Sequence, residues 1–229
     1  MPDPTAFITA NLPVTPVPGL PHIRLHTATP TSGVWRLAAD GVPPYWAWPW
    51  PGGLALAHHL AAHPELVAGK SVLDLGTGSG LLAIAAALAG ASSVTAADPD
   101  FNAIANLKLN ATLNTVTITA LQADILDGSP PDTEVILVGD LFYDPALALR
   151  VTAFLDRCLA AGAEVYVGDI GRDPLPRNRL IPLGFYPLLD FGEPPTATPR
   201  PACAYRFQTL GTQAALAIEP TKRQVPPLL

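Results

Sequence analysis

Short runs of apolar residues recur through the middle of the chain, and stretches with helical spacing separate them. Uninterrupted apolar runs of this kind, bounded by glycine, proline or acidic residues, are typical of strands buried on both faces. They predict five strands, over Ser71–Leu75, Ser93–Ala97, Val116–Leu121, Glu134–Gly139 and Glu164–Gly168. Two later segments have no helical spacing between them and predict a hairpin-like pair, Phe185–Phe191 and Cys203–Leu210.

Three helices are predicted between the five strands. Leu81–Ala89 is rich in alanine and leucine and ends at Gly90. Asp100–Thr112 carries apolar residues on one face, and Pro145–Ala161 begins with a proline, whose missing N–H is tolerated there. The apolar face of the second helix consists of Phe101, Ile104, Leu107 and Ala111. Apolar strands that alternate with helices predict an α/β fold, with a parallel sheet covered by helices on both faces.

The 27 prolines are concentrated at the two ends of the chain. Eleven lie in residues 1–51 and eleven in residues 171–229, so the regular core is predicted between them and irregular or edge structure outside it. We expect a Pro-rich, aromatic N-terminal extension over residues 1–51, one folded domain over residues 52–210 and a flexible C-terminal tail over residues 211–229.

The composition is that of a folded protein. Apolar residues make up 49% of the 229 residues and charged residues 14%, which excludes a chain that is disordered throughout. The longest nearly uninterrupted apolar run, Leu81–Ala91, is too short for a bilayer, and no secretion signal is recognisable at the start. We therefore expect a soluble, cytoplasmic protein with no membrane partner. Cys158 and Cys203 match no metal or redox spacing and are expected to be buried thiols.

The net charge of −6 is unevenly distributed along the sequence. Residues 1–144 carry 4 Lys and Arg against 12 Asp and Glu. An acidic N-terminal portion disfavours nucleic acid, whose phosphates bind basic surfaces. It favours a basic partner, although acidic residues spread over a solvated surface for solubility would give the same counts.

A glycine-rich loop follows the first predicted strand, with the sequence Asp74-Leu75-Gly76-Thr77-Gly78-Ser79-Gly80. Its glycines allow a tight turn and the close approach of a ligand to the backbone. Asp98 ends the next strand, where an acid can accept hydrogen bonds from ribose hydroxyls, and Asp124 follows the third strand. A dinucleotide-binding loop would have its last glycine at position 81. This chain has Leu81 there, so the pattern disfavours an NAD-dependent oxidoreductase.

The segment Val72–Gly80 resembles motif I of the seven-stranded S-adenosylmethionine-dependent methyltransferases. Other segments narrow the resemblance to the electron transfer flavoprotein β-subunit lysine methyltransferases, a branch of the protein methyltransferases with a D/E-x-x-F/Y motif. These segments are Pro21–His26, Pro44–Gly53, Gly139–Asp144 and Gly168–Arg172. The resemblance runs from about residue 20 to residue 210. It implies a Rossmann-like, seven-stranded sheet, mostly parallel with an antiparallel last strand. It also implies S-adenosylmethionine as the cofactor and a basic, lysine-bearing loop of the electron transfer flavoprotein β-subunit as the substrate.

The resemblance implies roles for individual residues as well. The implied cofactor-binding residues are Trp50, Gly76, Thr77, Gly78, Asp98, Asp124, Ile125 and Gly139. Among them, Asp98 would accept bonds from the ribose hydroxyls, and Asp124 with Ile125 would reach the adenine edge. Asp140 and Tyr143 are implied as catalytic residues that line the channel of the acceptor nitrogen. Arg172 matches the family's pattern, but the sequence assigns it no role.

Residue types at positions 140 and 143 suit methyl transfer to an amine. A lysine acceptor must be neutral, and with a pKa near 10.4 the neutral state is unfavourable at neutral pH by roughly 4 kcal/mol. An aromatic channel walled by Tyr143 lowers this difference, because an apolar surrounding disfavours the ammonium, and its ring face favours methylated ammonium states. We expect Asp140 to orient the amine, with the proton lost to water, rather than to act as a strong base.

Each feature also has a purely structural interpretation. Asp140 and Asp144 precede a predicted helix and could be N-caps, and Asp144 is expected to be one. Trp46 and Trp48 are expected to anchor an irregular segment on the core, and only Trp50 is assigned to the cofactor. The histidines at positions 58, 59 and 63 form no H-E-x-x-H motif, so we expect them at the surface or in packing and predict no metal site.

Alternative functions remain open at the level of sequence. The chain could methylate a ribosomal protein or a small-molecule nitrogen, or it could be a catalytically idle S-adenosylmethionine-binding module. The intact pair of Asp140 and Tyr143 disfavours the idle module. No residue of the sequence identifies the acceptor.

Overall fold

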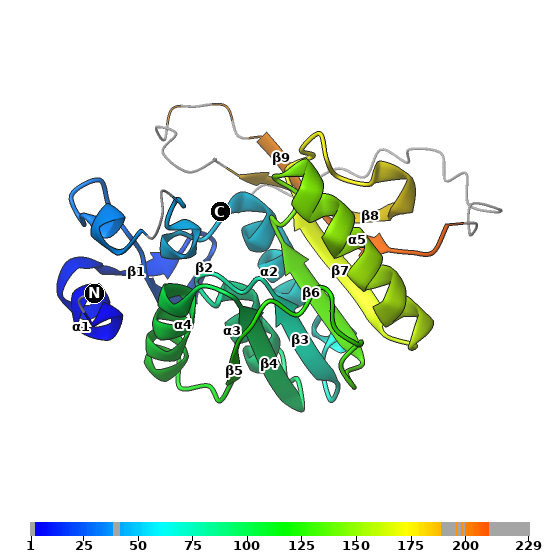
Figure 1. Cartoon of the computed structure of the whole chain (residues 1–229). Coiled ribbons are helices and arrows are strands. Elements are labelled where there is room, and N and C mark those ends of the chain that lie inside the picture. Colours follow the sequence, from blue (N-terminus) through cyan, green and yellow to red (C-terminus); the bar gives the residue numbers. More distant parts are fainter. Residues whose placement is uncertain (1–2, 39–41, 189–195, 197, 199, 211–229) are drawn as a thin grey trace.

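A seven-stranded sheet forms the centre of the computed structural model, which describes residues 3–38, 42–188, 196, 198 and 200–210 (Figure 1). The strand order is β5-β4-β3-β6-β7-β9-β8. The strands are β3 (Ser71–Leu75), β4 (Ser93–Asp98), β5 (Thr119–Gln122), β6 (Val135–Gly139), β7 (Glu164–Asp169), β8 (Leu180–Leu188) and β9 (Arg200–Phe207). Strand β9 runs antiparallel to both neighbours, whereas the pairs among β3 to β7 are parallel. The predicted sheet, mostly parallel with an antiparallel last strand, is confirmed.

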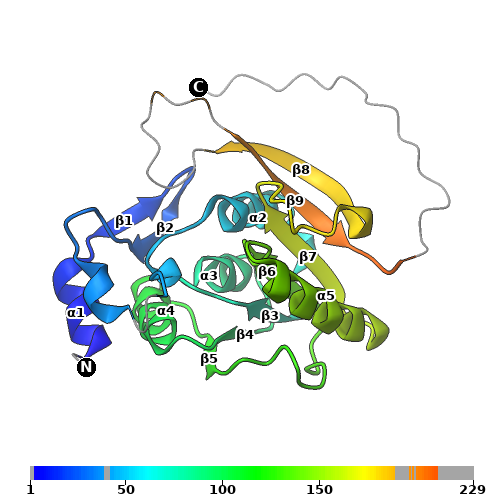
Figure 2. The ribbon, with the colours of Figure 1, turned by 45° about the horizontal axis from the view of Figure 1, so that its top comes forward.

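Helices cover both faces of this sheet, as predicted (Figure 2). Helices α2 (Pro51–Ala62), α3 (Leu81–Leu88) and α4 (Phe101–Leu113) pack on one face, and α5 (Pro145–Ala160) packs on the other. Alternate residues of each strand supply the two cores, so that Val72 of β3 faces the three helices and Leu73 faces α5. Because the central strands are buried on both faces, most of their residues are apolar.

The segment before α2 is more regular than its prolines suggested. It forms a helix, α1 (Pro4–Asn11), and a two-stranded antiparallel hairpin of β1 (Val14–Val17) and β2 (Leu20–His26). Two short 3₁₀ turns follow, over Val34–Leu37 and Tyr45–Ala47. A third apolar cluster joins this segment to α4 and includes Ile8, Leu12, Trp46, Trp48, Ala103 and Ala105. The segment is therefore packed against the sheet domain through its own core.

Predicted and observed boundaries differ mainly at the edges of the sheet. Strand β5 is shorter than predicted because it pairs with β4 only from Thr119 to Gln122. Strand β8 begins at Leu180, five residues earlier than predicted, and accommodates Pro182 because an edge strand need not donate every hydrogen bond. Phe101, predicted on the buried face of α4, is 56% exposed because it is the first residue of the helix, and the packed part starts at Ala103. Residues 189–191 of the predicted strand and the predicted tail over 211–229 lie outside the described residues.

The described residues also bear on the predictions about membrane spans, metal sites and the two cysteines. In the described part of the chain, no helix is both long enough and apolar enough to cross a membrane. The same residues contain no group of three or more His, Cys, Asp or Glu placed to hold a metal ion. Cys158 and Cys203 are free and buried, as predicted.

Candidate active site

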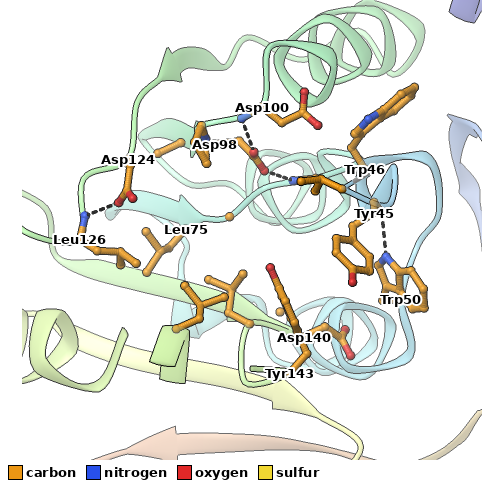
Figure 3. A pocket seen from close by; sticks show the side chains of 18 of the residues that line it. Tyr45, Trp46, Trp50, Leu75, Asp98, Asp100, Asp124, Leu126, Asp140 and Tyr143 are labelled. Atoms are coloured by element: carbon orange, nitrogen blue, oxygen red, sulfur yellow. Dashed lines mark hydrogen bonds between the residues drawn. The ribbon is translucent and has the colours of Figure 1, made fainter. Parts of the chain in front are cut away.

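A pocket of about 260 Å³ opens at the carboxyl ends of β3, β4 and β6, between the sheet and the segment that precedes α2 (Figure 3). Most of the residues that the sequence analysis singled out line it, namely Trp50, Gly76, Gly78, Asp98, Asp124, Ile125, Gly139, Asp140 and Tyr143. Thr77 is the exception and lines a smaller adjoining pocket, which shares Trp50, Gly76, Gly78, Gly139 and Asp140 with the larger one. Residues from five distant parts of the sequence thus converge where ligands bind in open α/β sheets.

Hydrogen bonds to the Asp74 side chain hold the glycine loop in place. The buried carboxylate of Asp74 accepts hydrogen bonds from the Thr77 hydroxyl at 2.5 Å and from the Ala83 backbone at 3.0 Å. Burial raises the pKa of Asp74 to about 7. Gly76 has φ of +67°, and a Cβ there would lie 2.6 Å from the Leu141 side chain, so the turn requires glycine at this position. The side chain of Thr77 therefore serves the loop, and the backbone of Gly76 and Gly78 faces the pocket.

Asp98 ties the glycine loop to the end of β4. Its carboxylate accepts hydrogen bonds from the backbone of Gly78 at 3.0 Å and of Asp100 at 2.9 Å, as Figure 3 shows. Burial raises the pKa of Asp98 to about 6. Each carboxylate oxygen keeps a second lone pair, so Asp98 can still accept a bond from a ligand hydroxyl.

Asp124 lies at the far end of the pocket. Its carboxylate accepts a hydrogen bond from the Leu126 backbone at 3.1 Å and forms an ion pair with Arg150 at 2.9 Å. The side chain is 45% exposed. These bonds fix the loop after β5, which carries Ile125 into the pocket lining.

Three aromatic side chains stand together at the other end of the pocket. The rings of Tyr45 and Tyr143 have centroids 5.2 Å apart, and Trp50 meets Tyr45 edge-on at 6.0 Å. The indole nitrogen of Trp50 also donates to the Tyr45 carbonyl at 2.7 Å. Tyr45 and Tyr143 are 41% and 46% exposed, so this aromatic wall (Tyr45, Trp50 and Tyr143) borders the opening. Tyr45 was not expected in the site from the sequence, although it stands in the same aromatic-proline segment as Trp50.

Trp46 and Trp48 differ in how their indole nitrogens are paired. Both are buried in the third apolar cluster, which confirms the predicted anchoring role. Trp48 donates to the Ala28 carbonyl at 3.0 Å. The Trp46 N–H is the one buried side-chain polar atom among the described residues that has no hydrogen-bond partner. Trp46 also lines the pocket, on the same side as Asp98 and Asp100 (Figure 3).

Asp140 occupies an unusual position just after β6. Its φ of +56° lies in the left-handed region, which costs a non-glycine residue about 1–2 kcal/mol. One carboxylate oxygen accepts the Gly53 backbone N–H at 2.6 Å and the other accepts Arg172 at 2.6 Å. Burial raises the pKa of Asp140 to about 6, although Arg172 acts in the opposite direction. Asp140 is thus not the cap of the helix that follows it. Asp144 caps that helix, as predicted, by accepting the Leu147 N–H at 2.9 Å.

The histidines at positions 58, 59 and 63 lie outside the pocket lining. His59 is buried and shares a hydrogen bond with the Tyr186 hydroxyl at 3.0 Å, and its pKa is lowered by burial. His63 pairs with the exposed Glu65 at 3.2 Å. These contacts agree with the packing and surface roles expected from the sequence.

The sequence and the fold of this chain are similar to those of known proteins. A family model described as ribosomal protein L11 methyltransferase matches residues 60–145. The electron transfer flavoprotein beta subunit lysine methyltransferase of Danio rerio is 45% identical over 157 residues, which cover 66% of this chain and 61% of that protein. Its namesake in Xenopus laevis is 40% identical over 197 residues, 82% of this chain and 80% of that protein. The crystal structure of Pyrococcus abyssi tRNA (uracil-54, C5)-methyltransferase with S-adenosyl-L-homocysteine shares the fold, with a TM-score of 0.51 at 18% identity over 68% of this chain and 38% of that chain.

Proposed function

The chain belongs to the family of electron transfer flavoprotein β-subunit lysine methyltransferases, and from this premise we propose that it methylates a lysine side chain of the electron transfer flavoprotein β-subunit. It is an S-adenosylmethionine-dependent methyltransferase. The observation that carries the proposal is the pocket, because it joins the glycine loop and Asp98 at one end to Asp140 and the aromatic wall at the other.

The residues of the pocket fit S-adenosylmethionine. Gly76 and Gly78 expose backbone, and Asp98 offers a carboxylate to ribose hydroxyls. We propose that the unpartnered N–H of Trp46, whose side chain lines the pocket on the same side, donates to a ligand oxygen. An unmade hydrogen bond at a buried donor costs about 1–3 kcal/mol, which such a bond would offset. When bound, S-adenosylmethionine supplies an electrophilic methyl group on a sulfonium sulfur. We assign Trp50, Thr77, Asp124, Ile125 and Gly139 to the same cofactor site.

Asp140 and the two tyrosines of the aromatic wall, Tyr45 and Tyr143, are assigned to the acceptor. The neutral amine of lysine is roughly 4 kcal/mol less stable than the ammonium at neutral pH, so the site must favour it. The rings of Tyr45 and Tyr143 exclude water from one side of the opening, which disfavours the charged form. A lone pair of the Asp140 carboxylate accepts an N–H of the amine and turns its nitrogen toward the cofactor end of the pocket, and orientation of this kind supplies much of the rate of an in-line displacement.

A single acceptor experiment tests the proposal. The purified chain is incubated with S-adenosylmethionine labelled on its methyl group and, in parallel, with electron transfer flavoprotein β-subunit, ribosomal protein L11 or total RNA. We expect label on lysine of the flavoprotein subunit, and its loss in Asp140→Ala while calorimetric affinity for S-adenosylmethionine stays within a few-fold. Label on L11 or RNA, with none on the flavoprotein subunit, would replace the substrate proposed here.

A further inference from the structure

Arg172 joins two buried carboxylates beside the pocket. It lies on the loop after β7, and one of its terminal nitrogens is 2.6 Å from Asp140 and 2.9 Å from Asp169. The side chains of Asp140 and Asp169 are 7% and 0% exposed, and that of Arg172 is 19% exposed. Arg172 also lines the pocket together with Tyr143. The guanidinium therefore stands at the acceptor end of the site, in contact with the residue that we assign to the amine.

Asp169 fixes the loop that carries Arg172. One of its carboxylate oxygens accepts the backbone N–H groups of Gly171 at 2.7 Å and Arg172 at 2.8 Å. Its other oxygen holds the guanidinium. Because Asp169 is fully buried at the end of a central strand, the position of Arg172 is determined by the sheet and not by solvent.

Three groups face the Asp140 carboxylate. They are the Gly53 N–H at the start of α2, the guanidinium of Arg172, and the charge of Asp169. The first two stabilise the ionised carboxylate, since a helix N-terminus and a guanidinium are both positive, whereas Asp169 raises the pKa of Asp140. Without the guanidinium, two buried carboxylates would face each other with no cation between them.

The bonds to Gly53 and Arg172 occupy one lone pair on each oxygen of Asp140 and leave about one on each for a further donor. They also set the plane of the carboxylate. An isolated carboxylate beside an amine would favour the ammonium, which cannot accept a methyl group. A carboxylate that is already paired with a guanidinium favours the ammonium form less strongly.

We propose that Arg172 is a positioning residue for methyl transfer, whose guanidinium fixes the Asp140 carboxylate at the acceptor end of the pocket and offsets its charge, so that the bound amine is held neutral. The inference rests on the proposed function, because it requires Asp140 to contact the acceptor. Among the described residues, the guanidinium of Arg172 is paired with these two carboxylates.

The test compares Arg172→Gln, Arg172→Lys and Asp169→Asn with the wild-type chain. Three quantities are measured: the titration of the Asp140 carboxyl by NMR, the pH profile of kcat/KM on electron transfer flavoprotein β-subunit, and calorimetric affinity for S-adenosylmethionine.

In Arg172→Gln, we expect the Asp140 titration and the acid limb of the profile to move up by about one pH unit or more, with transfer at neutral pH at least tenfold lower. In Asp169→Asn both should move down, since a negative neighbour is lost. Arg172→Lys should restore the acid limb but not the full rate, because an ammonium cannot reproduce the guanidinium geometry. Cofactor affinity should stay within about threefold throughout.

Arg179→Gln is the matched control. Arg179 is also a buried arginine paired with an aspartate, Asp156, but it does not line the pocket. Its substitution should lower Tm and leave the pH profile in place.

Opposite shifts of the Asp140 titration and the acid limb in Arg172→Gln and in Asp169→Asn separate a positioning role from a merely structural one. A merely structural role would lower stability and leave the titration and the acid limb unchanged in both variants. If the Asp140 titration and the acid limb coincide with the wild-type values in Arg172→Gln and in Asp169→Asn, the inference is wrong. If Arg172→Gln does not fold, Arg172→Lys and Asp169→Asn decide the question by the same measurements. If the wild-type chain transfers no methyl group to the flavoprotein subunit, the proposed function fails instead, which is a different result.

Discussion

The carboxylate of Asp140 accepts the backbone N–H of Gly53 at 2.6 Å, across 87 positions of sequence. Gly53 lies in the first turn of α2, so the strand-end acid assigned to the acceptor also caps the helix that follows the aromatic wall. One carboxylate thereby links the end of β6 to the start of α2. Substitutions of Asp140 consequently act on both activity and stability, and a pair of variants is needed to separate the two effects.

Asp140→Ala and Asp140→Gly form such a pair. Both remove the carboxylate, so both should lower methyl transfer about a hundredfold or more through lost orientation of the amine. Ala must adopt the φ of +56° that Gly adopts freely, so Asp140→Ala should be about 1–2 kcal/mol less stable than Asp140→Gly. Urea unfolding and labelled-methyl transfer measure the two effects. Full activity in Asp140→Gly would reduce Asp140 to a structural cap.

Trp46→Phe should weaken the binding of S-adenosylmethionine by about 1 kcal/mol, because an aromatic ring is kept while the N–H donor to the ligand is lost. In the ligand-free protein, this substitution should not reduce stability through a lost hydrogen bond. Trp48→Phe is the counterpart and should lower the free energy of unfolding by about 1 kcal/mol, since it leaves the Ala28 carbonyl unpaired. Calorimetry and urea unfolding distinguish the two. Unchanged affinity in Trp46→Phe would show that its N–H does not contact the cofactor.

Gly52→Ala and Gly53→Ala should change the stability of the folded chain in opposite directions, although the two residues are adjacent. A Cβ at Gly52 would lie 2.4 Å from the Gly168 carbonyl oxygen and 2.7 Å from the Asp140 carboxylate, so we expect a loss of about 1–3 kcal/mol or more. At Gly53 the nearest atoms are 3.8 Å away, and alanine should stabilise α2 by about 0.5–1 kcal/mol. Thermal unfolding of the ligand-free variants measures both. Equal Tm values would mean that α2 and β7 are not held in backbone contact.

The buried Asp74 predicts a pH dependence of stability. Its pKa in the folded chain is about 7, above the ordinary 3.8, so the folded state binds more protons than the unfolded state between these values. This group's contribution to the free energy of unfolding is therefore fully present below about pH 4 and is lost as the pH rises through 7. Asp74→Asn, which stays neutral, should gain stability relative to the wild-type chain as the pH rises from 5 to 8. Urea unfolding across this range checks the slope, and a difference independent of pH would contradict the prediction.

The acidic balance of residues 1–144 predicts salt dependence toward a basic protein loop. Asp98, Asp100 and Asp124 all line the pocket, so the negative field extends to the opening. With cofactor saturating, kcat/KM on the flavoprotein subunit should fall as ionic strength rises from about 0.01 M to about 0.15 M, because screening shortens the range of attraction. A free lysine peptide of low charge is the control and should respond less. If kcat/KM on the flavoprotein subunit does not change with ionic strength, electrostatic steering does not contribute to its binding.

Sequence patterns predicted the sheet well because each central strand is buried on both faces and ends at, or just before, a glycine or an acid. Ser71–Leu75 was predicted with the bounds that the structure shows. The N-terminal hairpin was missed because Pro16 and Pro21 lie inside its strands and because buried and exposed residues do not alternate regularly along them. The short β5 was overextended, since Val116 and Ile118 are apolar without pairing in the ladder.

Sequence patterns placed Gly76 and Asp98 in the pocket lining because each follows directly from the end of its own strand. The pairing of Asp140 with Arg172 depends on the register of β6 with β7, which sets Gly139 opposite Gly168 and brings the loops after both strands together. Sequence spacing does not contain that relation, so Arg172 had no assigned role. Tyr45 was missed for the same reason, because its contact with Tyr143 joins the N-terminal segment to the loop after β6.

The aromatic wall has two different origins in the chain. Tyr45 and Trp50 come from the segment before α2, whereas Tyr143 lies on the loop after β6. Substitutions at Tyr45 can therefore reshape the acceptor end while strand pairing, the glycine loop and Asp98 stay intact. A lineage that keeps this sheet can change the molecule it modifies by altering a stretch of chain that contributes no strand to it, and chimaeras that exchange this stretch between relatives offer a direct route to new acceptor preferences.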